Sequence, residues 1–505
     1  MATLARGGRL NAFGFVLRLG GMAPFLFIGG RIYGAAALGR FAYAVLTVEF
    51  AAQIAALGLR RGLAQLLADA KKPQSCVVAD GMLVAAMASA VAIAILVVFP
   101  KAMYPTTAVH GMDRLLAITV LAISWTDIAL AGLAYHHDVG STVRSRSIVQ
   151  PWTITIVAFG WSYISLDDGL IVAYVFSMVA ALVAALIPLV RCYGLPREWR
   201  PDLVTAWSTT WRNVPVAAAD AVEWASRRID LAVLGALMPA AFVGIYYAAQ
   251  QVATLPAKLK TSFEPVLGPA IVRRIAADDR AGIAKQVRQV TYWIIAAQLG
   301  IALALGIPGR PVMGLVGPDF TGGTAMLGFL LAAEVIAAAA VVSEAALIYV
   351  ARTTNMMLSL FMLALEAGLA AAFILIMRAQ ALPGSFQATG PAMALCVSLA
   401  FASIAKTHLL SRKLGQPVSG WRWDLGWATA AGVVVGGGVY LWLPESLQLI
   451  FGVPAILGAF FAMLWHKGFG PEDRELFRMR KSEVAGLREA EQAAFARDQI
   501  EDDII

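Results

Sequence analysis

Residues 211–238 read WRNVPVAAADAVEWASRRIDLAVLGALM, and this stretch decides the fold that we expect. It is long and apolar enough to cross a bilayer, yet, besides Arg212 at its start, five charged residues lie inside it: Asp220, Glu223, Arg227, Arg228 and Asp230. At about 100° per residue, all of these except Arg228 fall within about 80° on one helical face. Each charge at the bilayer centre costs about 2.5–3.5 kcal/mol. We therefore expect the face to line a water-filled cavity or meet partner charges, with a purely structural ion-pair ladder as the alternative.

The composition extends this expectation to the whole chain. Hydrophobic residues make up 59% of it and charged residues 14%, whereas about half of the residues of a soluble domain are apolar. Apolar blocks of about twenty residues recur along nearly the whole length, which is typical of membrane-spanning helices. The sequence therefore predicts an all-α, polytopic integral membrane protein. Its net charge of +8 is expected to set topology, and we expect no nucleic-acid partner.

Fourteen spans are expected, and polar segments divide them into groups. A connector with Gly194, Pro196 and Pro201 separates the sixth span from the seventh. The predicted spans are Asn11–Ile32, Phe41–Leu67, Ala79–Phe99, Leu115–His136, Ile148–Leu166, Leu170–Val190, Trp211–Met238, Phe242–Ile271, Val287–Pro308, Ala325–Val350, Met356–Met377, Pro391–Leu410, Leu425–Leu443 and Leu447–Trp465. The predicted domains are a six-helix lobe over 1–191, a cytoplasmic connector over 192–210, a second six-helix lobe over 211–411, two further helices over 412–467, and a charged cytoplasmic tail over 468–505.

Basic residues in the connections predict the orientation. Lys and Arg concentrate on one set of alternate connections, including the pairs Lys71–Lys72 and Arg144–Arg146. Because such residues favour the cytoplasmic side, we expect both termini to be cytoplasmic.

The two lobes are expected to be repeats. A shift of 205 residues places Gly30 on Gly235, Gly39 on Gly244, Phe41 on Tyr246 and Ala44 on Ala249. Six spans separate the two copies, so both enter the membrane in the same direction, as in parallel repeats. The same shift places Arg18 on Glu223.

Catalytic and metal-binding patterns are not recognised in the sequence. Cys76, Cys192 and Cys396 lie far apart and form no redox or metal motif. The histidines lie near predicted helix ends, and we find no phosphate-binding loop or nucleophile elbow. We expect neither enzymatic activity nor a catalytic residue, a metal or a cofactor, and transport is the remaining function.

Ionisable residues inside the spans are the candidates for a transport site. Arginine suits bidentate capture of phosphate, so the basic set predicts a site for an anionic head group such as a lipid pyrophosphate. A carboxylate in such a cavity could carry a coupling H⁺ or help to hold Na⁺. The basic candidates are Arg18, Arg60, Arg61, Arg212, Arg227 and Arg228, although Arg60 and Arg61 could instead mark an early helix end. The acidic residues are Glu49, Asp80, Asp127, Asp220, Glu223, Asp230, Glu334, Glu344 and Glu366, of which Asp220, Glu223, Glu334 and Glu366 are the ion-coupling candidates.

Proline residues indicate where a helix could bend. Pro24 lies in the first span, and Pro256 and Pro265 lie in the eighth beside Gln250 and Gln251. Proline frees backbone carbonyls, which at membrane depth are tolerated only beside protein or water. These three prolines are the predicted hinge or gate positions, although the basic inner end of the eighth span could equally contact anionic lipid.

Three segments resemble a known family. They are GRFAYAVLTVEFAAQIAALGLRRGLAQ (39–65), RSRSIVQPWTITI (144–156) and GIYYAAQQVATLPAKLKTSFEPVLGPAI (244–271). All three resemble the polysaccharide transporter family, the Wzx-like O-antigen flippases, whose superfamily includes lipid II flippases and multidrug antiporters. The resemblance covers about residues 11–410.

The resemblance implies two six-helix lobes in a V around a cationic cavity, with two extra helices after them. It implies an alternating-access flippase that moves an undecaprenyl-pyrophosphate-linked oligosaccharide across the bacterial inner membrane for surface polysaccharide or O-antigen synthesis, driven by an H⁺ or Na⁺ gradient. Arg18 and either Arg227 or Arg228 are the implied pyrophosphate ligands, and Asp220 and Glu223 depart from a wholly cationic cavity. The implied partners are membrane lipids and the polysaccharide polymerase and chain-length machinery, and a monomer is expected. The alternatives are a multidrug antiporter and a membrane-embedded glycan-assembly enzyme.

Overall fold

The computed structural model describes residues 17–68, 72–196, 199, 203–276 and 279–468. Every regular element in these ranges is a helix. Ten helical segments there are long and apolar enough to cross a membrane, and one of them, Leu17–Ala68, holds two passes separated by a break at Gly34, where φ is +82°. Within the described ranges each expected span corresponds to a helical segment, so the prediction of a polytopic all-α protein is confirmed.

The first half comprises six passes. A helix over 17–28 continues into the π-helical turn η1 (Gly29–Tyr33). The helices that follow are α2 (Gly34–Ala55), α3 (Leu59–Ala68), α4 (Gln74–Val98), the 3₁₀ segments η2 (Pro100–Ala102) and η3 (Asp113–Ile118), α5 (Thr119–Tyr135), α6 (Val139–Thr142), the π-helical turn η4 (Val143–Val149), α7 (Gln150–Trp161) and α8 (Gly169–Tyr193).

The second half and the C-terminal helices follow after the connector. They are α9 (Leu203–Ser226), α10 (Ile229–Leu237), α11 (Ala240–Ala276), α12 (Arg280–Gly306), α13 (Gly309–Val316), η5 (Pro318–Gly323), α14 (Thr324–Val350), α15 (Arg352–Ala379), α16 (Gly384–Gln387), α17 (Gly390–Leu414), α18 (Trp423–Trp442), α19 (Glu445–Leu447), η6 (Gln448–Gly452), α20 (Val453–Met463) and η7 (Leu464–Gly468). The expected tail after Gly468 lies outside the described residues, as do residues 11–16 of the first expected span.

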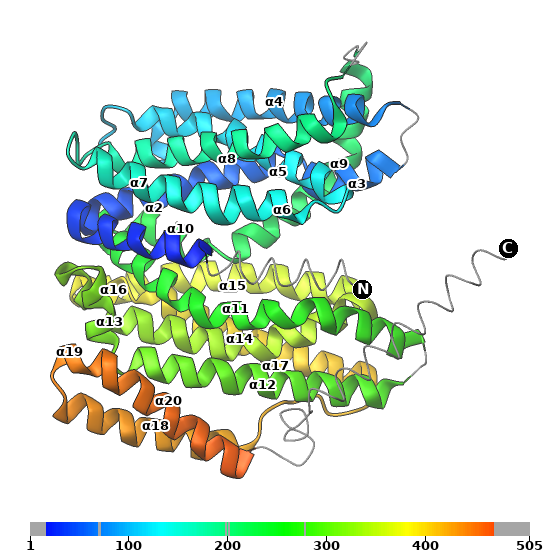
Figure 1. The fold of residues 1–505 in the computed structure, drawn as a ribbon. Helices are drawn as coiled ribbons and strands as arrows, with labels where there is room; N and C mark the ends of the chain where they lie inside the picture. Colours follow the sequence, from blue (N-terminus) through cyan, green and yellow to red (C-terminus); the bar gives the residue numbers. More distant parts are fainter. Residues whose placement is uncertain (1–16, 69–71, 197–198, 200–202, 277–278, 469–505) are drawn as a thin grey trace.

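Two bundles form the molecule, and each half of the chain supplies most of one bundle (Figure 1). The helices α18 and α20 pack against each other and on α12, at the edge of the second bundle (Figure 1). We call the side predicted to be cytoplasmic the inner side. It carries the ends of α3 and α8 at Ala68 and Tyr193. The domain boundaries stay predictions.

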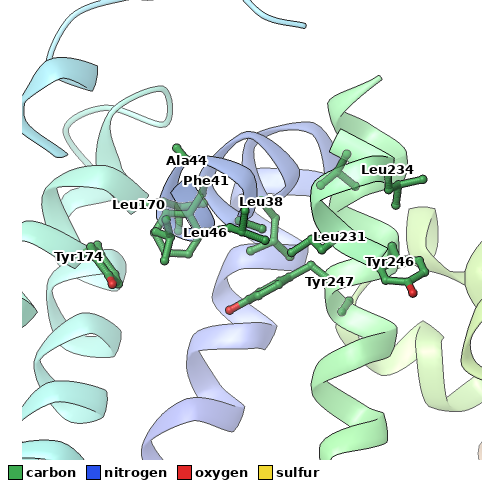
Figure 2. Packing of buried hydrophobic residues seen from close by; sticks show 14 of the residues in the cluster. Leu38, Phe41, Ala44, Leu46, Leu170, Tyr174, Leu231, Leu234, Tyr246 and Tyr247 are labelled. Atoms are coloured by element: carbon green, nitrogen blue, oxygen red, sulfur yellow. The ribbon is translucent and has the colours of Figure 1, made fainter. Parts of the chain in front are cut away.

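The apolar core explains how the two bundles join. One large cluster contains buried residues of both bundles, including Leu38 and Phe41 on α2 and Leu231 and Leu234 on α10. Figure 2 shows these side chains packed between α8, α2 and α11. Toward the inner side the core divides into one cluster around Leu63 in the first bundle and another around Leu410 in the second. The bundles therefore meet at the outer side and have separate cores at the inner side, as the arms of a V do.

The two bundles meet at a self-complementary glycine contact between α2 and α11. A Cβ placed on Gly39 would overlap the carbonyl oxygen of Ala240 and lie 2.5 Å from Gly244 N. A Cβ placed on Gly244 would overlap the carbonyl oxygen of Ala35. Ala240 and Gly244 lie 205 residues after Ala35 and Gly39, so each half makes the contact of the other. Such reciprocal contacts are the signature of a two-fold interface, and the repeat shift read in the sequence relates the halves in space.

Two expected spans are broken, and neither break was predicted. The second span divides into α2 and α3, because Leu57 and Gly58 both have positive φ, 49° and 68°. The seventh divides into α9 and α10 at Arg227 and Arg228, where Arg228 leaves helical geometry with φ −141° and ψ 0°. The helix α9, which the sequence places in the second half, packs mainly against α2, α3 and α4 of the first.

Candidate functional site

A layer of charged residues lies in the first bundle, near the point where α9 gives way to α10. Glu49 on α2 accepts a hydrogen bond from the Tyr174 hydroxyl of α8 at 3.2 Å. On the next helices, Arg146 of η4 pairs with Asp127 of α5 and donates to Gln150 Oε1 at 3.2 Å. We call Arg18, Glu49, Asp127, Arg146 and Arg228 the central layer.

Arg228 brings the second half into the central layer. Its guanidinium lies 3.9 Å from Glu49 Oε2, and both side chains are partly exposed, at 33% and 27%. Arg18, on the first helix, is exposed and interacts electrostatically with Arg146, Glu49 and Arg228. Charges from three other helical segments, η4, α2 and the start of α10, therefore act on Arg18.

The charges of the central layer do not cancel. Three arginines face two carboxylates, which leaves one net positive charge. Because a guanidinium offers several donors in a planar fork, it can exchange one carboxylate for a phosphate oxygen without losing a partner. The central layer can therefore accept an anion with more than one negative charge while Glu49 and Asp127 hold the arginines when it is empty.

A second charged group lies nearer the inner side and ties α9 to the first bundle, on which α9 packs. Arg61 of α3 pairs with two carboxylates of α9, at 3.1 Å to Asp220 Oδ1 and 2.6 Å to Glu223 Oε2. Arg227 pairs with Glu223 at 3.1 Å, and Arg60 interacts electrostatically with the same carboxylate. The guanidinium of Arg61 is half exposed, whereas Asp220 is 4% exposed. We call these five residues the inner cluster.

The expected single charged face of residues 211–238 is wrong. Asp220 and Glu223 do share the inner cluster with Arg227, but Asp230 lies beyond the break, in the first turn of α10. Its carboxylate accepts hydrogen bonds from the Tyr246 hydroxyl at 2.7 Å and from Gln250 Nε2 at 3.1 Å. The break reorients α10 and turns Asp230 toward α11.

Asp230 and Glu366 form a third charged group inside the second bundle. Their exposed fractions are 2% and 6%, and the two carboxyl groups interact electrostatically. Figure 2 shows why the neighbouring tyrosines serve different groups: Tyr246 and Tyr247 point to opposite sides of α11. Tyr246 binds Asp230, whereas Tyr247 interacts with Arg228, Glu49 and Arg18 of the central layer. The acidic pair therefore sits one helix away from the arginines.

The remaining predicted site residues are distributed as follows. Glu334 is half-buried on α14. Pro24 lies within the first helix, before η1. The helix α11 runs unbroken through Pro256, whose carbonyl oxygen accepts a hydrogen bond from Gln298 of α12 at 3.1 Å. The side chains of Arg212 and Pro265 lie outside the described residues, and the hinge role of the prolines stays a prediction.

Arg146 is the main residue of the central layer that the sequence reading misplaced. It was expected in an inner loop, because the fifth span was predicted to begin at Ile148. The helix begins instead at Val139, where the Asp138 carboxylate caps it by accepting the Ser141 N–H at 3.1 Å. Asp is a preferred N-cap residue, so Asp138 was the available signal. The helix start carries Arg146 into the span.

The fold and the charged layers define a class, that of polytopic helical transporters built from two related bundles. The chain belongs to the polysaccharide biosynthesis protein family, whose sequence profile matches residues 21–275. No curated protein sequence matches the chain.

Solved structures confirm the fold. The lipid II flippase MurJ in an inward closed conformation has a TM-score of 0.69 and 10% identity, covering 91% of this chain and 98% of its own. A multidrug resistance transporter of the MATE family, in the MOP superfamily, has a TM-score of 0.62 in its inward-facing form and 11% identity, covering 79% of this chain and 94% of its own. The outward-facing form of such a transporter has a TM-score of 0.54.

Proposed function

We propose that this protein is a flippase that moves an oligosaccharide linked to undecaprenyl pyrophosphate from the inner to the outer leaflet of the bacterial inner membrane. It works by alternating access and supplies surface polysaccharide synthesis. The single observation that carries the proposal is that Arg18 interacts with Arg146, Glu49 and Arg228, while Arg228, from the second half, lies 3.9 Å from Glu49 Oε2. Membership of the polysaccharide biosynthesis family supports a glycan cargo.

The chemistry of the central layer supports a pyrophosphate head group. A pyrophosphate diester carries two negative charges and several acceptor oxygens, which suit planar guanidinium donors. A cationic drug would meet a net positive charge there. Because the arginines come from both halves, a bound pyrophosphate would draw the halves together. The cargo would then make different contacts in different conformational states, and such differential binding is what lets a ligand shift a conformational equilibrium.

The proposed function is tested in a bacterial strain that lacks this gene and is complemented with variants. Arg18→Gln is expected to abolish the surface glycan and to accumulate the lipid-linked unit, with normal protein level in the membrane. Arg310→Gln is the control, because Arg310 lies at the outer side and pairs with Glu445. Normal glycan with Arg18→Gln would refute the site. Export of a cationic drug with no change in glycan would favour the multidrug antiporter.

The inner cluster is expected to hold α9 against α3 in the first bundle. Asp220→Asn combined with Glu223→Gln leaves Arg61 without its carboxylates. Partly exposed ion pairs contribute roughly 0.2–1 kcal/mol each, so we expect a threefold to tenfold shift toward a state in which α9 separates from α3. Spin-label distances between α3 and α9 measure this. Asp279→Asn removes a carboxylate that pairs with Arg274 within the second half and is expected to leave the distances unchanged. Unchanged distances in the double variant would mean that the cluster does not hold α9 in place.

The acidic pair is proposed to couple transport to an ion gradient. Two buried carboxyl groups that interact electrostatically can share a proton or bind a cation. Glu366→Gln is expected to remove the response of transport to an imposed H⁺ or Na⁺ gradient and to leave gradient-free exchange. The measurement is flipping of a fluorescent polyprenyl pyrophosphate in proteoliposomes, with Glu445→Gln as an exposed control. A gradient response that persists with Glu366→Gln would exclude this pair.

A further inference from the structure

A fourth charged group lies in the inner part of the second bundle. Lys406 on α17 is 5% exposed, and its ammonium lies 3.0 Å from Glu344 Oε2 on α14. The same Nζ donates to Ser359 Oγ on α15 at 3.1 Å. Three helices therefore meet on one buried cation, outside the central layer and the inner cluster.

This group has an unfilled hydrogen-bond position. Asn355, 6% exposed, donates through Nδ2 to Glu344 Oε1 at 3.4 Å, but its Oδ1 has no partner among the described residues. A buried carbonyl oxygen without a partner costs about 1–3 kcal/mol, and water commonly satisfies such a group. The Glu344 side chain is 37% exposed. The group is thus open at one edge and has a place for water.

The helix α15 aligns this group with the acidic pair. Ser359 and Glu366 are seven residues apart, two helical turns, so both face the same neighbours with a rise of about 10 Å between them. A small apolar cluster of Met362, Ala340 and Ala402 lies about one helical turn from Ser359, Glu344 and Lys406 along their own helices, toward the level of Glu366. Methionine is flexible and adapts its packing readily, so a thin and deformable barrier separates Glu366 from the polar group.

We propose that Glu344, Asn355, Ser359 and Lys406 form a water-filled proton-transfer site that connects the Asp230–Glu366 pair with the cytoplasm. This rests on the ion coupling of the proposed function and names H⁺ as the ion on this path. The fixed ammonium of Lys406 disfavours a metal cation here, because like charges repel at short range. A proton can pass because Glu344 accepts and releases it without displacing the lysine.

The transfer needs no reactant besides water. An O–H bond of the acidic pair breaks, water at the level of Met362 relays the proton, and a new O–H bond forms on Glu344. Glu344 then returns the proton to cytoplasmic water and regains its negative charge, while Lys406 stays an ammonium. The titratable groups that face this path are Asp230, Tyr246 and Glu366 at its outer end and Glu344 and Lys406 at its inner end, and His408 is exposed on another face of α17.

Water access is tested first, by a readout that is independent of cargo. In a background with Cys76, Cys192 and Cys396 replaced by alanine, Ser359→Cys is expected to react with a charged, membrane-impermeant thiosulfonate only from the cytoplasmic side. Lys413→Cys, exposed on the same helix as Lys406, is the positive control, and Ala402→Cys is the unreactive control. A Ser359→Cys thiol that is unreactive from the cytoplasmic side would overturn the proposal.

Proton movement is tested next, in proteoliposomes with an entrapped pH dye and a fluorescent polyprenyl pyrophosphate. Lys406→Met and Glu344→Gln are each expected to lower coupled proton flux about tenfold while gradient-free lipid exchange stays within about twofold. Lys413→Met is expected to behave as wild type. Unchanged proton flux, or an equal fall in proton flux and lipid exchange, would show that Lys406 and Glu344 form only a structural ion pair. A wild-type protein that moves protons but not the lipid would refute the proposed cargo. The proton flux of the wild type and the variants would still test the proton-transfer site.

Discussion

Arg228→Gln is expected to slow flipping of a pyrophosphate-linked lipid about a hundredfold. Arg228 is the member of the central layer that the second half supplies, and its removal leaves Glu49 without its 3.9 Å partner. Two charge-assisted hydrogen bonds to the cargo contribute about 1.5 kcal/mol each, and each 1.4 kcal/mol is about a factor of ten. The initial rate in proteoliposomes measures the effect.

The neighbouring arginine provides a matched control. Arg227 has the same charge and chain position to within one residue, but its side chain is 70% exposed and pairs with Glu223 at the end of α9. Arg227→Gln is expected to change the rate less than about threefold. Arg228→Lys should retain part of the activity, because an ammonium keeps the charge without the planar fork. If Arg227→Gln and Arg228→Gln slowed flipping equally, Arg228 would have no special role in the central layer.

Gly39→Leu is expected to hold the transporter open at the outer side and to abolish turnover. A Cβ alone already overlaps Ala240 of α11, and the larger side chain forces the helices apart. Overpacking of this kind costs about 1–3 kcal/mol, which is about a tenfold to hundredfold shift away from the outer-closed state. Spin labels at Thr106 and Gln380, both exposed, are expected to report an increased distance across the two bundles.

The matched variant is Gly328→Leu on α14, because a Cβ there meets no atom within 4 Å. It is expected to keep the wild-type distance and rate. A Gly39→Leu protein that is present at normal level, with an unchanged distance and normal transport, would show that the glycine contact does not control the outer side. Gly244→Leu should reproduce the Gly39→Leu result, since the two positions are equivalent across the repeat.

The spans were predictable because membrane-crossing length and apolar character are local properties of the sequence. The equivalence of the two glycines in the α2–α11 contact was also predictable, because the 205-residue shift already paired Gly39 with Gly244. The break between α9 and α10 was not, because nothing in the local sequence replaces the helical hydrogen bonds there. Contacts from other helices accompany it, because Arg228 lies beside Glu49 of α2 and Asp230 accepts hydrogen bonds from Tyr246 and Gln250 of α11.

The candidate site was predictable in residue type and only partly in arrangement. Arg18 and Arg228 were both recognised as arginines inside predicted spans and as candidate phosphate ligands, and both lie in the central layer. Arg146 was assigned to a loop because a charge next to an apolar edge is ambiguous until the helix start is known. Lys406 lies close to the predicted end at Leu410, and its partners are on α14 and α15, so a linear reading does not reveal that it is buried.

The opposite directions of Tyr246 and Tyr247 have a thermodynamic consequence. One turn of α11 contacts both the arginines that are proposed to bind cargo and the carboxylates that are proposed to bind the proton. Any rotation of that turn which favours one tyrosine contact alters the other. Linkage is reciprocal. If a bound proton lowers the affinity for cargo by some factor, bound cargo lowers the affinity for the proton by the same factor. A rigid turn of α11 at Tyr246 and Tyr247 would then be enough to couple the exchange of a proton for lipid.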